Sequence, residues 1–70
     1  MAYNGHRNWN HWNVALWIAN DENLYRLARA YSHTYGKDEA ARRLVDLLPA
    51  KTPDGAPYST TAIRAALVDL

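Results

Sequence analysis

Three histidines are the side chains of this 70-residue sequence best suited to hold a metal ion: His6, His11 and His33. Zinc sites commonly take their ligands from cysteines, or from two histidines four residues apart on one helix. The sequence has no cysteine, and no two of its histidines have that spacing. We therefore expect no metal site and no cofactor, and we expect His11 to act locally at the start of a helix.

The other reactive side chains do not form a catalytic pattern. The sequence contains neither a phosphate-binding loop nor a nucleophile elbow, and the absence of cysteine removes thiolate chemistry. Three aspartates, Asp46, Asp54 and Asp69, stand in contexts typical of solvent-facing or turn residues. The sequence thus predicts a protein that is not an enzyme.

Three tryptophans are concentrated in residues 9–20, where they could form a cage for a cation or a stacking platform for a base. In a small domain, tryptophans at helical spacing more commonly supply buried core area. A helical wheel places Trp9, Trp12 and Leu16 together on one side of the helix. We expect this side to face the core.

The opposite side of the same helix carries Val14, Trp17 and Ile18. Trp17 is expected either to pack under the last helix or to belong to a partner-binding patch. If this side is exposed, the three residues provide the apolar centre of a protein-binding surface, and the next helix provides its polar rim. The predicted partner-binding residues are Val14, Trp17, Ile18, Arg26, Arg29 and His33.

Four segments have the hydrophobic period of a helix: about 9–20, 22–35, 38–48 and 61–70. Residues suited to begin or end a helix stand at their boundaries: Asn8, Asp21, Gly36, Pro49, and either Ser59 or Thr60. We predict one all-α domain over 1–70, a compact bundle of about four short helices around the tryptophan-rich first helix, with a turn-rich loop over 49–59. The predicted core takes residues from every helix: Trp9, Trp12, Leu16, Leu24, Leu27, Tyr31, Leu44, Leu48, Ile63 and Leu67.

Asn13 forms a narrow polar seam between the two apolar sides of the first helix. A buried amide without a partner costs about 1–3 kcal/mol, so we expect its side chain to bond to another part of the chain. The loop from Pro53 to Tyr58 is the predicted partner. It overlaps Thr52-Pro53-Asp54-Gly55, which has the residues of a tight turn, and Tyr58 is suited to hold the loop to the core.

Size and charge narrow the classes of function. Seventy residues are few for a stable core, which makes self-association worth considering. The formal net charge is +1 with acidic and basic residues interleaved, whereas nucleic-acid binders usually have a basic excess. The longest apolar run, 14–19, is too short to cross a membrane, the N-terminus does not resemble a signal peptide, and the lack of cysteine suits a reducing cytoplasm.

Residues 27–45 resemble a helix-turn-helix with Gly36 at the turn, in which Arg42 and Arg43 would face phosphates or bases. However, Lys37 and Arg42 fall where that motif usually buries apolar groups, and both arginines have acidic residues nearby. A helical hairpin is the simpler interpretation. A small nucleic-acid-binding regulator therefore remains an alternative hypothesis, as does a structural homodimer whose tryptophan helices pack together.

The N-terminal third resembles a group of short proteins from bacteriophages and mobile elements, with the signature N-G-W-x-N-W-x-T-W-N-V-A-L-W. His6 stands where the signature has tryptophan, and His11 where it has threonine, which shifts the helix-capping role to Asn8. The Thr52-Pro53-Asp54-Gly55 turn also resembles that group. The matching residues are Asn4, Gly5, Asn8, Trp9, Trp12, Asn13, Val14, Ala15, Leu16 and Trp17, followed by Asn20, Asp21, Glu22, Leu24 and Tyr25.

No established activity comes with this resemblance, but it implies a viral or prophage protein in the cytoplasm of a bacterial host. Small phage proteins of this kind often bind and block a host defence complex, as anti-CRISPR inhibitors do, which is an argument by association. Our hypothesis is that the protein acts by binding a host or phage protein complex, with inhibition of a bacterial defence system as its specific form.

Overall fold

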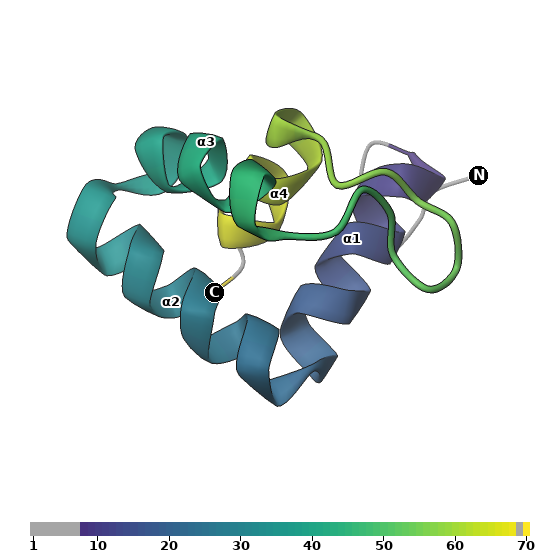
Figure 1. The fold of residues 1–70 in the computed structure, drawn as a ribbon, viewed down its shortest axis with the longest axis horizontal. Coiled ribbons are helices and arrows are strands. Elements are labelled where there is room, and N and C mark those ends of the chain that lie inside the picture. Colours follow the sequence, from purple (N-terminus) through teal and green to yellow (C-terminus); the bar gives the residue numbers. More distant parts are fainter. Residues whose placement is uncertain (1–7, 69) are drawn as a thin grey trace.

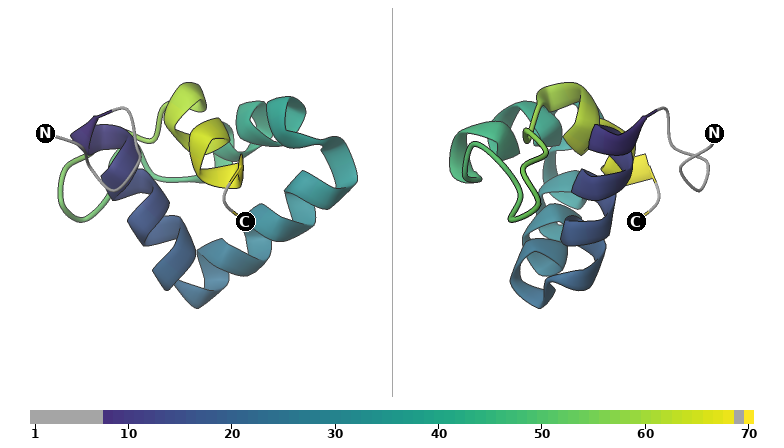
Figure 2. Two further views of the ribbon diagram at one scale, coloured as in Figure 1. Left: turned by 180° about the vertical axis from the view of Figure 1, so that it is seen from behind. Right: turned by 90° about the vertical axis from the view of Figure 1, so that its right-hand side faces the viewer.

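The computed structural model describes residues 8–68 and 70, and these fold into four helices. They are α1 (Trp9–Asn20), α2 (Glu22–Tyr35), α3 (Lys37–Leu47) and α4 (Thr60–Val68). In Figure 1, α1 and α2 form a V, and α3 and α4 lie across its open end. The view from behind in Figure 2 shows the same arrangement. The predicted all-α class is confirmed.

The helix boundaries follow the capping residues. Asn8 accepts a hydrogen bond from the His11 backbone N–H at 3.0 Å, and Asp21 accepts one from the Leu24 N–H at 3.0 Å, so α1 and α2 begin where predicted. Ser59, rather than Thr60, caps α4 by accepting from the Ala62 N–H at 3.1 Å.

The C-terminal ends of α2 and α3 also have local causes. Gly36, with a φ of 79°, is the single residue between α2 and α3, and glycine enters that region without steric cost. The third helix ends at Leu47, one residue earlier than predicted. Leu48 precedes Pro49 and has the extended backbone that a following proline favours.

The core is made largely of small side chains. Of the twelve apolar residues buried in the described part of the chain, six are alanines. Leu44, Ile63 and Leu67 are fully buried, as predicted. Four further predicted core residues are partly buried and pack against this cluster: Leu24, Leu27, Tyr31 and Leu48. The alanines allow the helices to approach closely, which leaves little room for indole rings between them.

The rotation of α1 is the point at which the sequence-based prediction was wrong. Val14 and Ile18 are fully buried, whereas Trp9 is 37% exposed and Trp12 and Leu16 are half-buried. The predicted core residues Trp9, Trp12 and Leu16 therefore lie outside the buried core cluster. We call the side of α1 formed by Trp9, Trp12, Leu16 and the exposed Ala19 the outer α1 face.

Hydrogen bonds hold Asn13, between the two sides of α1, to the 48–59 loop. Thr52 Oγ1 donates to Asn13 Oδ1 at 2.6 Å, and Asn13 Nδ2 donates to Asp54 Oδ2 at 2.9 Å. The Ala56 N–H donates to Thr52 Oγ1 at 3.1 Å, which fixes the hydroxyl within the loop. The predicted bond from Asn13 to the loop is thus confirmed, and both figures place the loop beside the N-terminal half of α1.

The loop itself is a tight turn, as predicted. The Gly55 N–H donates to the Thr52 carbonyl at 2.9 Å, and Gly55 has a φ of 95°. An isolated antiparallel bridge joins Lys51 to Pro57, and the buried Tyr58 holds the end of the loop to the core. Asp54 also accepts from the Trp17 indole N–H at 2.9 Å, so this one carboxylate bonds to two residues of α1.

Substitutions on the two sides of α1 should have unequal effects on stability. We expect Ile18→Ala to lower the free energy of unfolding by about 2–5 kcal/mol, because it leaves a cavity in a close-packed core. Trp9→Ala removes a larger side chain but should cost less than half as much, because that residue lies at the surface. Urea unfolding of both variants measures the difference. A greater loss for Trp9→Ala would show that the rotation of α1 is wrong.

The Asp54 carboxylate should make stability depend on pH. The Asn13 amide, and then the Trp17 indole N–H, donate to it and lower its pKa below the usual 3.8. Because the folded pKa is lower than the unfolded one, this contribution is complete above the unfolded pKa and is lost as pH falls through the folded pKa. From about pH 5 to about pH 2, Asp54→Asn should therefore lose less stability than the wild-type protein, as measured by urea unfolding. Equal losses would contradict this role.

Candidate functional site

The three apolar residues predicted as the centre of a partner-binding surface do not form an exposed patch. Val14 and Ile18 are buried in the core, at 0% and 1% exposure. Trp17 is half-buried and its indole is bonded to Asp54, so it packs against the 48–59 loop. The prediction that these residues form an exposed patch was therefore wrong, since a fully buried side chain has no surface to offer a partner.

The residues predicted as the polar rim lie on the solvent side of α2. Arg26 forms an ion pair with Glu22. The Arg29 guanidinium lies 5.7 Å from the centre of the Tyr25 ring and donates to its hydroxyl at 3.1 Å. His33 is exposed on the same helix. The structure does not join these residues to the buried side of α1, so the six predicted residues do not form one site.

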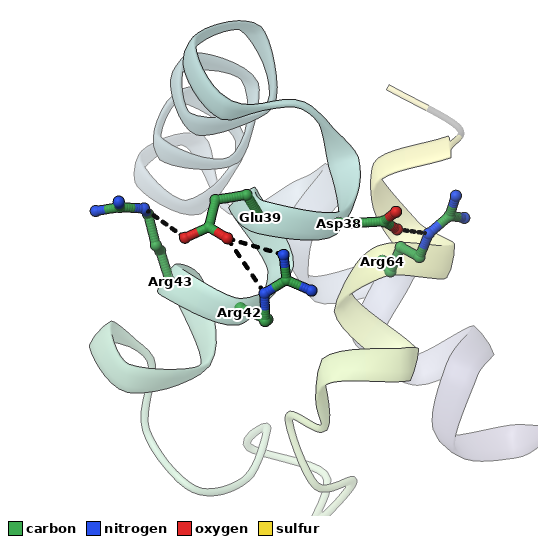
Figure 3. A network of polar contacts seen from close by, with 5 residues as sticks. All are labelled: Asp38, Glu39, Arg42, Arg43 and Arg64. Atoms are coloured by element: carbon green, nitrogen blue, oxygen red, sulfur yellow. Dashed lines mark hydrogen bonds and ion pairs between the residues drawn. The ribbon is translucent and has the colours of Figure 1, made fainter.

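A second polar region consists of charged residues on α3 and α4 (Figure 3). Glu39 accepts from Arg42 Nε and Nη2 at 3.2 and 2.8 Å, and from Arg43 Nε at 3.0 Å. Asp38 pairs with Arg64 of α4. Arg64 lowers the pKa of Asp38, and chiefly Arg42 lowers that of Glu39. The arginines of this network are therefore engaged with carboxylates of the same protein.

The arrangement of α2 and α3 is also fixed by aromatic contacts. The Arg43 guanidinium lies 4.1 Å from the centre of the Tyr35 ring, and the Tyr31 and Tyr35 rings are 5.4 Å apart. The Arg43 contact joins α3 to α2 across Gly36, whereas the two tyrosines both belong to α2. We interpret the α2–α3 region as a helical hairpin.

Among residues 8–68 and 70, no group of three or more histidine, cysteine or acidic side chains could hold a metal ion, and His6 lies outside the described residues. No helix in this part of the chain has both the length and the apolar character needed to cross a membrane.

The outer α1 face is the surface feature that remains, and its large apolar side chains lie on successive turns of one helix. Trp9 is the most exposed of them, Trp12 and Leu16 are half-buried, and α1 contains no acidic or basic residue other than His11. The other exposed large apolar residues of the described chain lie on α2, on α3 and at or after the end of α4: Tyr35, Leu47, Val68 and Leu70. The outer α1 face differs from them in having three large apolar side chains along one side of a single helix, and adjoining apolar side chains mark an interaction surface.

Sequence reasoning missed this face because it assigned the same residues to the core. The polar seam at Asn13 does not by itself rank the two sides of α1, because it lies between them. The Trp17 indole, on the Val14 side, bonds to the same Asp54 carboxylate as Asn13, and this second contact was not predicted.

Comparison with known proteins gives one match. Residues 1–69 match a family of unknown function, DUF7249. No curated protein and no solved structure matches the chain. The family description names no activity and no source, so the phage-like signature of residues 4–25 stays a prediction. Since the match covers nearly the whole sequence, the chain belongs to the DUF7249 family.

Proposed function

We propose that this protein acts by binding another protein through the outer α1 face. One observation carries the proposal: three large apolar side chains of α1, Trp9, Trp12 and Leu16, are left outside the core cluster. Tryptophan is among the residues most enriched at the energetic centres of protein interfaces. Covering the remaining exposed area of these side chains stabilises a complex by roughly 25 cal/mol per Å² of apolar surface.

The outer α1 face is also rigid enough to bind without reordering. Asn8 caps the start of α1, and the hydrogen bonds of Asn13 and Trp17 hold its inner side to Asp54. Val14 and Ile18 fix the same helix in the core. A surface that is already ordered loses little conformational entropy on binding, which favours affinity.

The proposed biological setting follows from the signature in residues 4–25. We place the protein in the cytoplasm of a bacterial host, as a phage or prophage product, and its target in a host or phage protein complex. Inhibition of a bacterial defence system, by steric blocking as in anti-CRISPR proteins, is the specific form of this proposal. No described residue is assigned a catalytic role.

The alternative of a nucleic-acid-binding regulator receives less support from the arginines. Arg26, Arg42, Arg43 and Arg64 each have a carboxylate partner within the chain. A phosphate backbone would have to compete with these carboxylates for each arginine.

Two matched variants test the proposed surface. Ala19 and Ala30 are both exposed helical alanines, but only Ala19 belongs to the outer α1 face. Ala19→Glu should reduce capture of the target from a bacterial lysate by about tenfold or more, because a charge is placed in an apolar interface, and Ala30→Glu should not. Captured proteins are identified by mass spectrometry, and circular dichroism confirms that both variants fold.

Retention of the target by Ala19→Glu to the same extent as by Ala30→Glu would refute the outer α1 face as the binding surface. Trp9→Ala supplies a second variant for the same surface. It removes one exposed side chain without introducing a charge, and it should weaken capture in the same direction. Capture of duplex DNA instead of protein, with an affinity that falls steeply with salt, would favour the regulator.

A further inference from the structure

We infer that the outer α1 face binds the same face of a second copy of this chain when no target is present. This inference rests on the proposed function, because it uses the same surface and names one occupant for it. The two copies would be related by a twofold axis, so that each contributes identical residues. Target binding and self-association would then exclude each other.

The first argument is the shape of the outer α1 face. Trp12 and Leu16 are four residues apart and form a ridge along the helix, while Ala15 and Ala19 form a parallel row of small side chains next to it. Ala15 packs partly against the core, and Ala19 is exposed. A twofold axis places the ridge of each copy over the small residues of the other, which is the usual way in which two helices interlock.

The second argument is charge. None of the eight lysines and arginines and none of the seven acidic residues of the chain lies in α1. Two such faces meet without repulsion between like charges, and the net charge of +1 adds little repulsion at longer range. A charged partner, by contrast, would find no complementary charge on this helix.

The third argument is the composition of the core. Half of the apolar residues buried in the described chain are alanines, and no tryptophan is among them. A chain of 70 residues has little core to begin with, and here its largest apolar side chains contribute little to it. Pairing of two outer α1 faces would bury indole surface that the single chain leaves accessible.

The expected dimer is weak because the paired surface is small. A helix of twelve residues is about 18 Å long and about 10 Å across, so that pairing buries a few hundred Å² per copy. Stable interfaces bury about 800 Å² per partner. Self-association should therefore occur at high micromolar concentration and give way to a target that covers a larger surface.

Analytical ultracentrifugation of the full chain tests this inference. The weight-average mass should be that of a monomer at a protein concentration of about 10 μM. It should rise towards that of a dimer at about 1 mM, as expected for a weak interface. Ala19→Glu should raise the dissociation constant by about tenfold or more, whereas Ala30→Glu should leave it unchanged. A monomer mass at every concentration, or a dimer that Ala19→Glu does not weaken, would overturn the inference.

The two proposals fail in distinguishable ways. If the protein is monomeric at every concentration but Ala19→Glu still loses a captured target, the inference is wrong and the proposed function holds. If Ala19→Glu disrupts a dimer but neither the wild-type protein nor the variant captures a target, the inference holds and the proposed function is wrong. When a captured target is added to the dimer, the dimer should dissociate, so that each complex contains one copy of this chain. A complex in which two copies remain in contact through α1 would contradict mutual exclusion.

Discussion

The buried amide of Asn13 is the constraint on which the arrangement of this protein depends. An amide removed from water must recover its hydrogen bonds, and Asn13 does so with Thr52 and Asp54. Those partners lie about forty positions later in the sequence, so these bonds close the fold between its first helix and its last loop. Because Asn13 lies between the two apolar sides of α1, its bonds alone do not decide which side is inside; the Trp17 indole, on the Val14 side, bonds to the same Asp54 carboxylate. Val14 and Ile18 are core residues, while Trp12 and Leu16 are not.

The alanine-rich faces of the other helices are consistent with the same rotation. Ala40 and Ala41 on α3, and Ala62 and Ala66 on α4, are buried. Small side chains bring helix axes close together, and a close approach accommodates valine and isoleucine better than an indole ring. Hydrogen bonding and packing volume therefore both favour burial of the Val14 side. Trp9 and Trp12 consequently lie outside the core cluster, whereas Trp17 is bonded to the loop.

Local signals in the sequence predicted the helices well, because the capping groups are close in sequence to the groups they satisfy. Asn8 and Asp21 each bond to a backbone N–H three residues later, and Gly36 needs only its own backbone freedom. The rotation of α1 was predicted wrongly, because both of its sides are apolar and hydrophobicity alone cannot rank them. The bond from Asn13 to the loop was predicted, but the bond from Trp17 to Asp54 was not. Asp38 shows a similar limit, since its partner Arg64 is distant in sequence.

The distribution of charge distinguishes the outer α1 face from the rest of the described surface. On α3, Glu39 binds two arginines and Asp38 reaches across to α4, so ionic groups there are satisfied by neighbouring groups. On α2, Glu22 pairs with Arg26. A partner approaching these helices would have to displace ion pairs and the water around them, which offsets much of the gain from new contacts. On α1 a partner meets indole and leucine side chains with no ion pair to break. The ion pairs on the outside of α2 and α3 therefore favour the outer α1 face as the surface for the proposed binding, since α1 carries none of them.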